Sequence, residues 1–349
     1  MKKRVQSSGS DRPWGFFILT FFHRALFLVG CLTASIALLS TTLVQAFDAK
    51  VHLMKRRQQG ILTGMPFMAN LAPRTFIDDT GRKVFLANPP QRIISLAPSI
   101  TEILYALGAG DSVVGVTEFC DYPPETSSKP RVGDSRPNLE AIIGLKPDLV
   151  LAMQVVRTDV FGTLEQLKIP LFIMEAKTLE DIYSHIRTLG RMLERVNEAN
   201  SLATSMRQDV QVVADKVRML PRPRVLYVLY GKPFITVGPG SFIHQLIELA
   251  GGENIASDAG SAYPRLSMEV VVQKDPEIIV FPAMAQEGLR DADLAPWKRW
   301  PTLTAVKTGN LHHVPWGLMS RPGPRIVQGL VHLAKIIHPE VFQGQDGQQ

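Results

Sequence analysis

Two stretches of the chain share one order of hydrophobic and polar positions. The apolar run RIISLAP, starting at Arg92, precedes SITEILYALGAG (Ser99–Gly110), and RVLYVLY, starting at Arg224, precedes SFIHQLIELAGG (Ser241–Gly252). Runs rich in β-branched and large apolar residues predict strands. Each following segment has apolar residues at helical spacing, a serine at its start and glycines at its end. This pattern predicts a helix with a serine N-cap and a glycine stop.

A second matching pair lies downstream of the first in each half. NLEAIIGLKPDLVLAM starts at Asn138 and LSMEVVVQKDPEIIVFP starts at Leu266. Each contains a helix start, a glutamate, an apolar helix face, a proline break and a strand, and Glu140 and Glu269 each precede that proline by seven residues. Two matches in the same order indicate a duplicated α/β unit. The predicted fold is therefore α/β, with two lobes of mostly parallel sheet flanked by helices.

A long segment almost without glycine or proline separates the two halves. From Asn197 to Leu220 its apolar residues recur at steps of three or four, which predicts a helix with Asn197 as its N-cap. An ordinary surface helix is the alternative, but one connector helix between two matching lobes fits better. We predict a lobe at 74–177, a connector at 178–221 and a second lobe at 222–345, with a ligand cleft between the lobes.

The positive charge of the chain belongs to its N-terminal segment. The net charge is +6, but residues 1–73 hold nine Lys/Arg against two Asp/Glu, so the remainder is close to neutral. This distribution removes most of the support for a nucleic-acid-binding protein. A content of 45% hydrophobic and 20% charged residues excludes a mainly disordered or fibrous chain.

The N-terminal segment has the order of an export signal. Basic residues up to Arg24 precede a stretch without charge until Asp48, and small residues end at Ala46. We predict a signal peptide at 1–46, cleaved after Ala46, and a linker at 47–73. An uncleaved membrane anchor and a lipoprotein signal with Cys31 as the lipidated residue are the second and third alternatives. All three place the body outside the cytoplasm, in the periplasm.

The body lacks the sequence motifs of the common enzyme sites. It contains no GxSxG, no HExxH, no phosphate loop and no GxGxxG opening a helix, so we predict no catalytic residues and no enzyme. Cys31 and Cys120 are the only cysteines, and we expect Cys120 to be buried. The adjacent His312 and His313 point to opposite faces of a strand, so we predict no metal site.

These segments together resemble a known family. RIISLAPSITEILYALGAGDSVVGVTEFCDYPPE, RVGDSRPNLEAIIGLKPDLVLA and GPGSFIHQLIELAGGENI are similar to the extracytoplasmic solute-binding proteins of ABC importers for cobalamin and ferric siderophores, and most similar to the cobalamin-binding members. The resemblance covers roughly Thr75 to Phe342. It implies two α/β lobes joined by one long helix, which agrees with the pattern above. It also implies partners, namely an ABC permease dimer with its ATPase subunits, and a monomeric binding protein.

The resemblance assigns roles to particular residues. One acidic residue on each lobe of the family meets arginines of the permease, and the matching positions are Glu140 and Glu269; the alternative is two helix-start glutamates stabilised by the helix dipole. The matching ligand-binding positions are Phe119, Tyr122, Asp134, Arg136, Met153, Tyr263 and Arg321.

Two of these positions depart from the cobalamin-binding pattern. Asp134 stands where cobalamin binders can carry a tryptophan, and Met153 is apolar but not aromatic. Arg136, Arg265 and Arg321 suit an anionic ferric chelate equally well, and Tyr122, Tyr230 or Tyr263 can ligate haem iron.

The expected ligand is therefore cobalamin, with a ferric siderophore or haem as alternatives, and no resident cofactor is predicted. Two other functions remain open. They are an extracytoplasmic enzyme or chaperone for tetrapyrroles, and a ligand sensor anchored by an uncleaved N-terminal helix.

Overall fold

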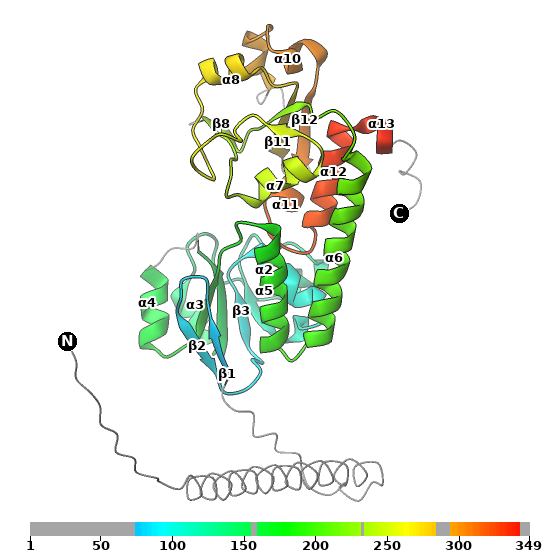
Figure 1. Cartoon of the computed structure of the whole chain (residues 1–349). Coiled ribbons are helices and arrows are strands. Elements are labelled where there is room, and N and C mark those ends of the chain that lie inside the picture. The colour runs from blue at the N-terminus through cyan, green and yellow to red at the C-terminus, as the bar shows by residue number, and fades with distance from the viewer. Residues whose placement is uncertain (1–73, 155–158, 232–233, 284–293, 343–349) are drawn as a thin grey trace, which may run out of the picture. The chain divides into compact units, whose positions relative to one another are not determined.

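The computed structural model describes residues 74–154, 159–231, 234–283 and 294–342 (Figure 1). The chain divides into two units, residues 1–70 and 71–349, and all described residues belong to the second. The predicted signal peptide and linker lie outside the described residues. Within the described ranges, every helix is too short or too polar to cross a membrane.

The first sheet is parallel and has both faces covered. Its order is β4-β3-β5-β6, with β3 at Ile93–Ser95, β4 at Val113–Val116, β5 at Leu149–Met153 and β6 at Leu171–Met174. Along β5 the side chains alternate between two hydrophobic clusters, and all of its first four residues are buried. Because both faces are buried, these strands read as continuous apolar runs rather than as alternating patterns. We call this sheet and its helices the N-terminal lobe.

The second sheet repeats the topology of the first. Its order is β10-β7-β11-β12, again parallel throughout, with β7 at Arg224–Tyr227, β10 at Glu253–Asn254, β11 at Ile278–Ala283 and β12 at Leu311–Pro315. In both sheets the first strand in sequence lies between the second and the third. This agreement confirms the duplicated α/β unit and the fold class. We call this sheet and its helices the C-terminal lobe.

Helices and two small hairpins complete the described part of the chain. An antiparallel hairpin, β1 (Arg74–Ile77) and β2 (Lys83–Leu86), precedes the first sheet, and β8 (Tyr230–Gly231) pairs with β9 (Phe234–Ile235). The helices are α2 (Pro98–Ala106), α3 (Leu139–Gly144), α4 (Asp159–Gln166), α5 (Leu179–Met192), α6 (Val196–Val217), α7 (Phe242–Leu249), α8 (Met268–Lys274), α10 (Thr304–Thr308), α11 (Trp316–Met319), α12 (Ile326–Ile337) and α13 (Pro339–Phe342), with 3₁₀ turns at Gly110–Ser112, Pro124–Ser128 and Trp297–Arg299.

An arginine makes the same two hydrogen bonds at the start of β3 and at the start of β7. Its side chain donates to a backbone carbonyl, and its backbone N–H donates to a carboxylate. Arg92 Nε donates to a carbonyl oxygen just after α3 at 3.1 Å, and the Arg92 backbone N–H donates to Asp148 at 2.9 Å. In the second lobe Arg224 Nε donates to a carbonyl just after α8 at 2.9 Å, and the Arg224 N–H donates to Glu277 at 2.9 Å. The repeat therefore extends from the backbone topology to its side-chain contacts.

The long helix α6 joins the cores of the two lobes. It packs against α5 of the N-terminal lobe and, further along its length, against α12 of the C-terminal lobe (Figure 1). Its buried residues recur at helical spacing along one face, and they belong to one hydrophobic cluster that includes strands of both sheets. The predicted buried face is confirmed at Ala199, Met206, Val210, Val213 and Val217.

Two predicted helix caps are wrong. Helix α6 begins at Val196 with Arg195 as its N-cap, because the Arg195 N–H closes the α5–α6 turn by donating to the Gly190 carbonyl at 2.7 Å; Asn197 lies inside the helix. Helix α2 begins at Pro98, whose fixed φ suits the first helical position, so its N-cap is Ala97 rather than Ser99. Ser241 does cap α7, accepting from the His244 N–H at 3.2 Å.

Candidate functional site

The predicted ligand-binding residues lie at the carboxyl ends of the strands or in the loops that follow them. Phe119, Tyr122, Asp134 and Arg136 follow β4, and Met153 ends β5. Tyr263 follows β10, and Arg321 follows β12. Because the strands of each sheet are parallel, their carboxyl ends meet at one edge, which is where open α/β sheets bind ligands.

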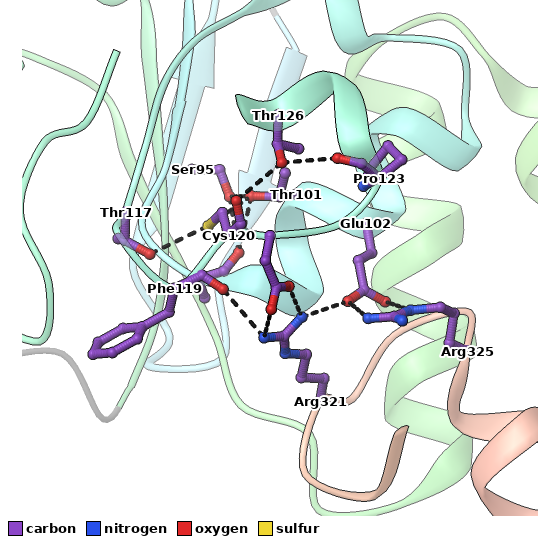
Figure 2. Close-up of polar contacts among 12 residues, drawn as sticks. Ser95, Thr101, Glu102, Thr117, Phe119, Cys120, Pro123, Thr126, Arg321 and Arg325 are labelled. Atoms are coloured by element: carbon purple, nitrogen blue, oxygen red, sulfur yellow. Dashed lines mark hydrogen bonds and ion pairs between the residues drawn. The ribbon is translucent and has the colours of Figure 1, made fainter. Parts of the chain in front are cut away.

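The loop after β4 is anchored firmly in the N-terminal lobe. Arg131 Nη1 donates to the carbonyls of Thr117 and Cys120 at 2.8 and 2.9 Å, and Thr126 Oγ1 donates to the Cys120 carbonyl at 3.0 Å. Cys120 is buried, as predicted, and Thr101 Oγ1 contacts its Sγ at 3.2 Å (Figure 2). The backbone around Cys120 therefore has a fixed position beside α2.

Arg321 reaches from the C-terminal lobe to this loop. Its guanidinium donates to Asp121 through Nη1 and Nη2 at 2.5 and 3.2 Å, and to the Phe119 carbonyl through Nη2 at 3.2 Å (Figure 2). Nη1 also donates to Glu102 of α2 at 3.3 Å. These contacts join the carboxyl-end loops of the two sheets directly.

Arg325 makes a second connection between the lobes. Its Nε and Nη2 donate to the two carboxylate oxygens of Glu102 at 2.9 and 2.6 Å, a bidentate pair (Figure 2). Its guanidinium also lies over the ring of Tyr122, 3.9 Å from the ring centre. We use the name lobe junction for the six residues Glu102, Phe119, Asp121, Tyr122, Arg321 and Arg325.

Charges are balanced at the lobe junction, with two arginines and two carboxylates. The Glu102 side chain is only 2% exposed, whereas that of Asp121 is 69% exposed. Partial burial alone would raise the pKa of Asp121, but the hydrogen bond and positive charge of Arg321 outweigh it and hold that pKa below its usual value. Asp121 is therefore an ionised partner of Arg321 at neutral pH.

The lobes also meet at the start of α5, and Glu175 lies close enough to Tyr263 to act on its charge. The Leu179 N–H at the start of α5 donates to Gln245 Oε1 of α7 at 2.9 Å. Burial raises the pKa of the Tyr263 phenol, and the negative charge of Glu175, which follows β6, raises it further. The phenol of the half-exposed Tyr263 is thus within electrostatic range of a carboxylate of the opposite lobe.

The remaining predicted ligand residues are not part of the lobe junction. Asp134 accepts the Arg136 N–H at 2.8 Å within one exposed turn, and Met153 is half-buried at the end of β5. The ligand role of these residues, as of Phe119, Tyr122, Tyr263 and Arg321, stays a prediction. Within the described part of the chain, no three His, Cys, Asp or Glu side chains cluster as metal ligands would.

Glu140 and Glu269 occupy equivalent positions in the two lobes. Each is the second residue of its helix, α3 or α8, and each is exposed. Asn138 and Ser267 cap these helices by accepting a backbone N–H three residues ahead. The Ser267 hydroxyl also lowers the pKa of Glu269 by hydrogen bonding to its carboxylate. The expected helix-start geometry is present in both lobes, and the docking role is still untested.

Sequence reasoning missed three members of the lobe junction: Glu102, Asp121 and Arg325. Glu102 is the only charged residue in the helix segment SITEILYALGAG, whose other residues are apolar or uncharged. An ionised residue is seldom buried unless it is paired, so this single carboxylate was a usable signal. Its partners were not identifiable, because they lie more than 200 positions away.

Two parallel sheets with one strand order, joined by a long helix and by contacts between their carboxyl-end loops, define a bilobal binding protein. The chain belongs to the periplasmic binding protein family, whose model matches residues 93–315.

Relatives of this chain carry names that describe binding proteins. A cobalamin-binding protein of Halobacterium salinarum is 36% identical over 276 residues, which are 76% of this chain and 74% of the relative. An uncharacterized ABC transporter substrate-binding lipoprotein of Bacillus subtilis, YvrC, is 31% identical over 279 residues, which are 78% of this chain and 87% of the relative.

Solved structures agree with the fold. The periplasmic vitamin B12 binding protein BtuF of Vibrio cholerae is 31% identical, with a TM-score of 0.62, covering 72% of this chain and 98% of its own. The periplasmic heme-binding protein RhuT of Roseiflexus sp. RS-1 is 27% identical, with a TM-score of 0.64, covering 72% of this chain and 99% of its own. These relatives and neighbours are all named as binding proteins.

Proposed function

We propose that this protein is the solute-binding component of an ABC importer, which captures a corrinoid of the cobalamin class between its lobes and delivers it to a membrane permease. The observation that carries the proposal is the 36% identity, over 76% of the chain, to a protein named for cobalamin binding. The relative named as an ABC transporter substrate-binding lipoprotein supports the importer role.

The chemistry of the lobe junction suits a large, flat macrocycle. Phe119 and Tyr122 are large aromatic residues that stay about half exposed although their backbone is held in place, and Tyr263 is similarly exposed on the other lobe. Exposed aromatic rings gain stability by packing against an apolar ring system. A corrin offers such a ring system together with amide groups that can pair with nearby polar side chains.

Ligand titration tests the proposal directly. The purified protein is titrated with cobalamin, with its precursor cobinamide, with haemin and with a panel of ferric siderophores, and the visible absorption spectrum of protein isolated from cells is recorded. We expect cobalamin or cobinamide to bind most tightly. Failure of both at micromolar concentration would refute the corrinoid assignment.

A ferric siderophore or haem is the second candidate, and two observations favour keeping it. The RhuT neighbour is named for heme binding. Arg136 and Arg265 are exposed near the predicted site, and Tyr230 is among the most exposed aromatic side chains of the described residues. Arginines suit an anionic chelate and a tyrosine oxygen suits ferric iron, so haemin and siderophores belong in the same titration.

Delivery to the permease would use Glu140 and Glu269. Two equivalent carboxylates on two similar lobes can address two identical permease subunits. Glu140→Arg together with Glu269→Arg should abolish uptake and permease association while leaving ligand affinity unchanged, because attraction becomes like-charge repulsion. Added salt should also weaken the docking of the unmodified protein.

Matched controls make the docking experiment specific. Glu165 of α4 and Glu253 of β10 are exposed glutamates in the two lobes. Glu165→Arg together with Glu253→Arg makes the same change in net charge and should leave uptake intact. Normal uptake by the double variant of Glu140 and Glu269 would refute the docking role and would leave these residues with a role in the stability of their helices only.

Export and monomeric state complete the proposed function. The protein would act in the periplasm after cleavage behind Ala46. Sequencing the N-terminus of the mature protein distinguishes a start at Phe47 from a lipidated Cys31 or an uncleaved Met1, and sedimentation measures the oligomeric state.

A further inference from the structure

The buried carboxylate of Glu102 holds both arginines of the lobe junction. Its side chain is 2% exposed, and its two oxygens accept three hydrogen bonds, one from Arg321 and two from Arg325. Both arginines belong to the segment between α11 and α12 of the C-terminal lobe, whereas Glu102 lies on α2 of the N-terminal lobe. One side chain thus orients two cations from the opposite lobe.

The backbone of the arginine segment lies directly against α2. A Cβ atom added to Gly323 would be 3.3 Å from the Ser99 carbonyl oxygen and 3.6 Å from Glu102 Oε2. The first of these is tighter than nine in ten real Cβ contacts, so the absence of a Cβ at Gly323 favours this close approach to α2. The arginines therefore reach Glu102 from a segment that is itself packed on the same helix.

The arginines in turn hold the loop that carries the exposed rings. Arg321 donates to the Phe119 carbonyl and to Asp121, and Arg325 covers the ring of Tyr122. Phe119 and Tyr122 are still 52% and 42% exposed, so Phe119 and the part of Tyr122 that Arg325 leaves open can contact a ligand. The contacts restrain the loop and leave much of its aromatic surface exposed.

Stability alone is a weak reason for this arrangement. A buried ion pair loses much of its Coulombic gain to desolvation, and apolar residues often replace such pairs without loss of stability. What the pair does supply is a defined geometry, because two guanidinium groups must sit at fixed angles to one carboxylate. Rings that are held in their binding position before the ligand arrives cost less to order on binding.

We propose that Glu102 is a positioning residue of the ligand site: through Arg321 and Arg325 it fixes the Phe119–Tyr122 loop and the two lobes relative to each other in the ligand-free protein. The part that concerns affinity rests on the proposed ligand-binding function. The part that concerns the loop holds whatever the ligand is.

Hydrogen–deuterium exchange tests the positioning role without any ligand. Exchange of backbone amides is compared between the unmodified protein and Glu102→Gln, which keeps the shape of the side chain and removes its charge. We expect faster exchange in segments 117–126 and 318–325, with the rest of both lobes unchanged, because local opening and global unfolding are separate events. Unchanged exchange in these two segments would overturn the proposal, as would a uniform increase across the chain.

A matched control and a milder variant make the exchange experiment decisive. Glu248 of α7 also pairs with an arginine, Arg222, at 2.6 Å, but within its own lobe, so Glu248→Gln should leave segment 117–126 unchanged. Asp121→Asn alters the exposed member of the lobe junction, which folding tolerates more readily. It should accelerate exchange of segment 117–126 alone, and it provides the test if Glu102→Gln does not fold.

Affinity for cobalamin supplies the second readout. If the positioned loop is populated in about one molecule in ten of Glu102→Gln, the apparent dissociation constant rises roughly tenfold. Glu248→Gln should bind as the unmodified protein does. If the unmodified protein binds neither cobalamin nor haemin, the proposed function fails while the exchange data still decide the role of Glu102. If ligand binds and Glu102→Gln binds it equally well despite faster exchange, the positioning role in the ligand site is refuted.

Discussion

Phe119→Ala is the sharpest test of where the ligand binds. Phe119 is 52% exposed, and a phenylalanine side chain offers about 200 Å² of surface, so a ligand packed on it can bury about 100 Å². At about 25 cal/mol per Å² this burial is worth about 2.5 kcal/mol. Allowing for residual exposure, the loss on truncation is about 2 kcal/mol, which is roughly a thirtyfold increase in the dissociation constant.

Phe85 provides the matched control for this prediction. It is an aromatic residue of the same lobe with a similar exposed fraction, 55%, but it lies on strand β2 of the hairpin and not at the carboxyl end of a sheet. Calorimetric titration with cobalamin should therefore give a thirtyfold loss for Phe119→Ala and no loss for Phe85→Ala. Equal affinities of the two variants, with unchanged thermal unfolding, would show that the ligand does not pack on the loop after β4.

Two further predictions concern the stability of the fold. Gly190→Ala would place a Cβ in steric conflict with that of Ala199 and should lower the free energy of unfolding by about 1–3 kcal/mol. Gly162→Ala on α4, with open space around it, should not. Adding Ala199→Gly should restore part of the loss in Gly190→Ala, because the new Cβ would still lie 3.0 Å from the Arg195 carbonyl oxygen. Burial alone would raise the pKa of Asp79, but hydrogen bonds from His185 and a backbone N–H outweigh it and lower that pKa. The ionised form is therefore favoured by folding, so its stabilisation is complete above about pH 4 and is lost as the pH falls further. Asp79→Asn should show a flatter dependence of unfolding free energy on pH in acid, and an unchanged slope would contradict the assignment.

Much of the fold could be predicted from the sequence because its determinants are local. Strands that are buried on both faces appear in the sequence as apolar runs. The helices α2 and α7 end at Gly108 and Gly251, which adopt the left-handed φ that terminates a helix. The period of the buried positions on α6 is equally local. The packing of α6 on both lobes then follows from burying these faces together, whereas the strand order of each sheet comes from the structure.

The candidate site could be predicted only in part, because its decisive contacts are not local. Phe119, Tyr122 and Arg321 were singled out one by one, yet nothing near Arg321 in the sequence indicates that its partners are Asp121 and Glu102. A charged side chain finds its partner through the packing of whole lobes. The sequence shows that Arg321 is charged, but its carboxylate partners can be identified only from the folded structure.

The position of the α2 cap also determines which residue of the C-terminal lobe is equivalent to Glu102. An ungapped comparison of the two helix segments pairs Glu102 with His244, which contacts Asn254 within its own lobe. Helix α2 starts two residues earlier than a cap at Ser99 would allow, so Ser99 and Ser241 are not equivalent positions. The two helices align instead from their glycine stops, Gly108 and Gly251, and Glu102 and Gln245 each lie six residues before that glycine. Both side chains then cross to the opposite lobe, Glu102 to Arg321 and Arg325, Gln245 to the N–H of Leu179. The duplicated unit thus directs the same helix position toward the other lobe twice, and only the N-terminal lobe places a charge there.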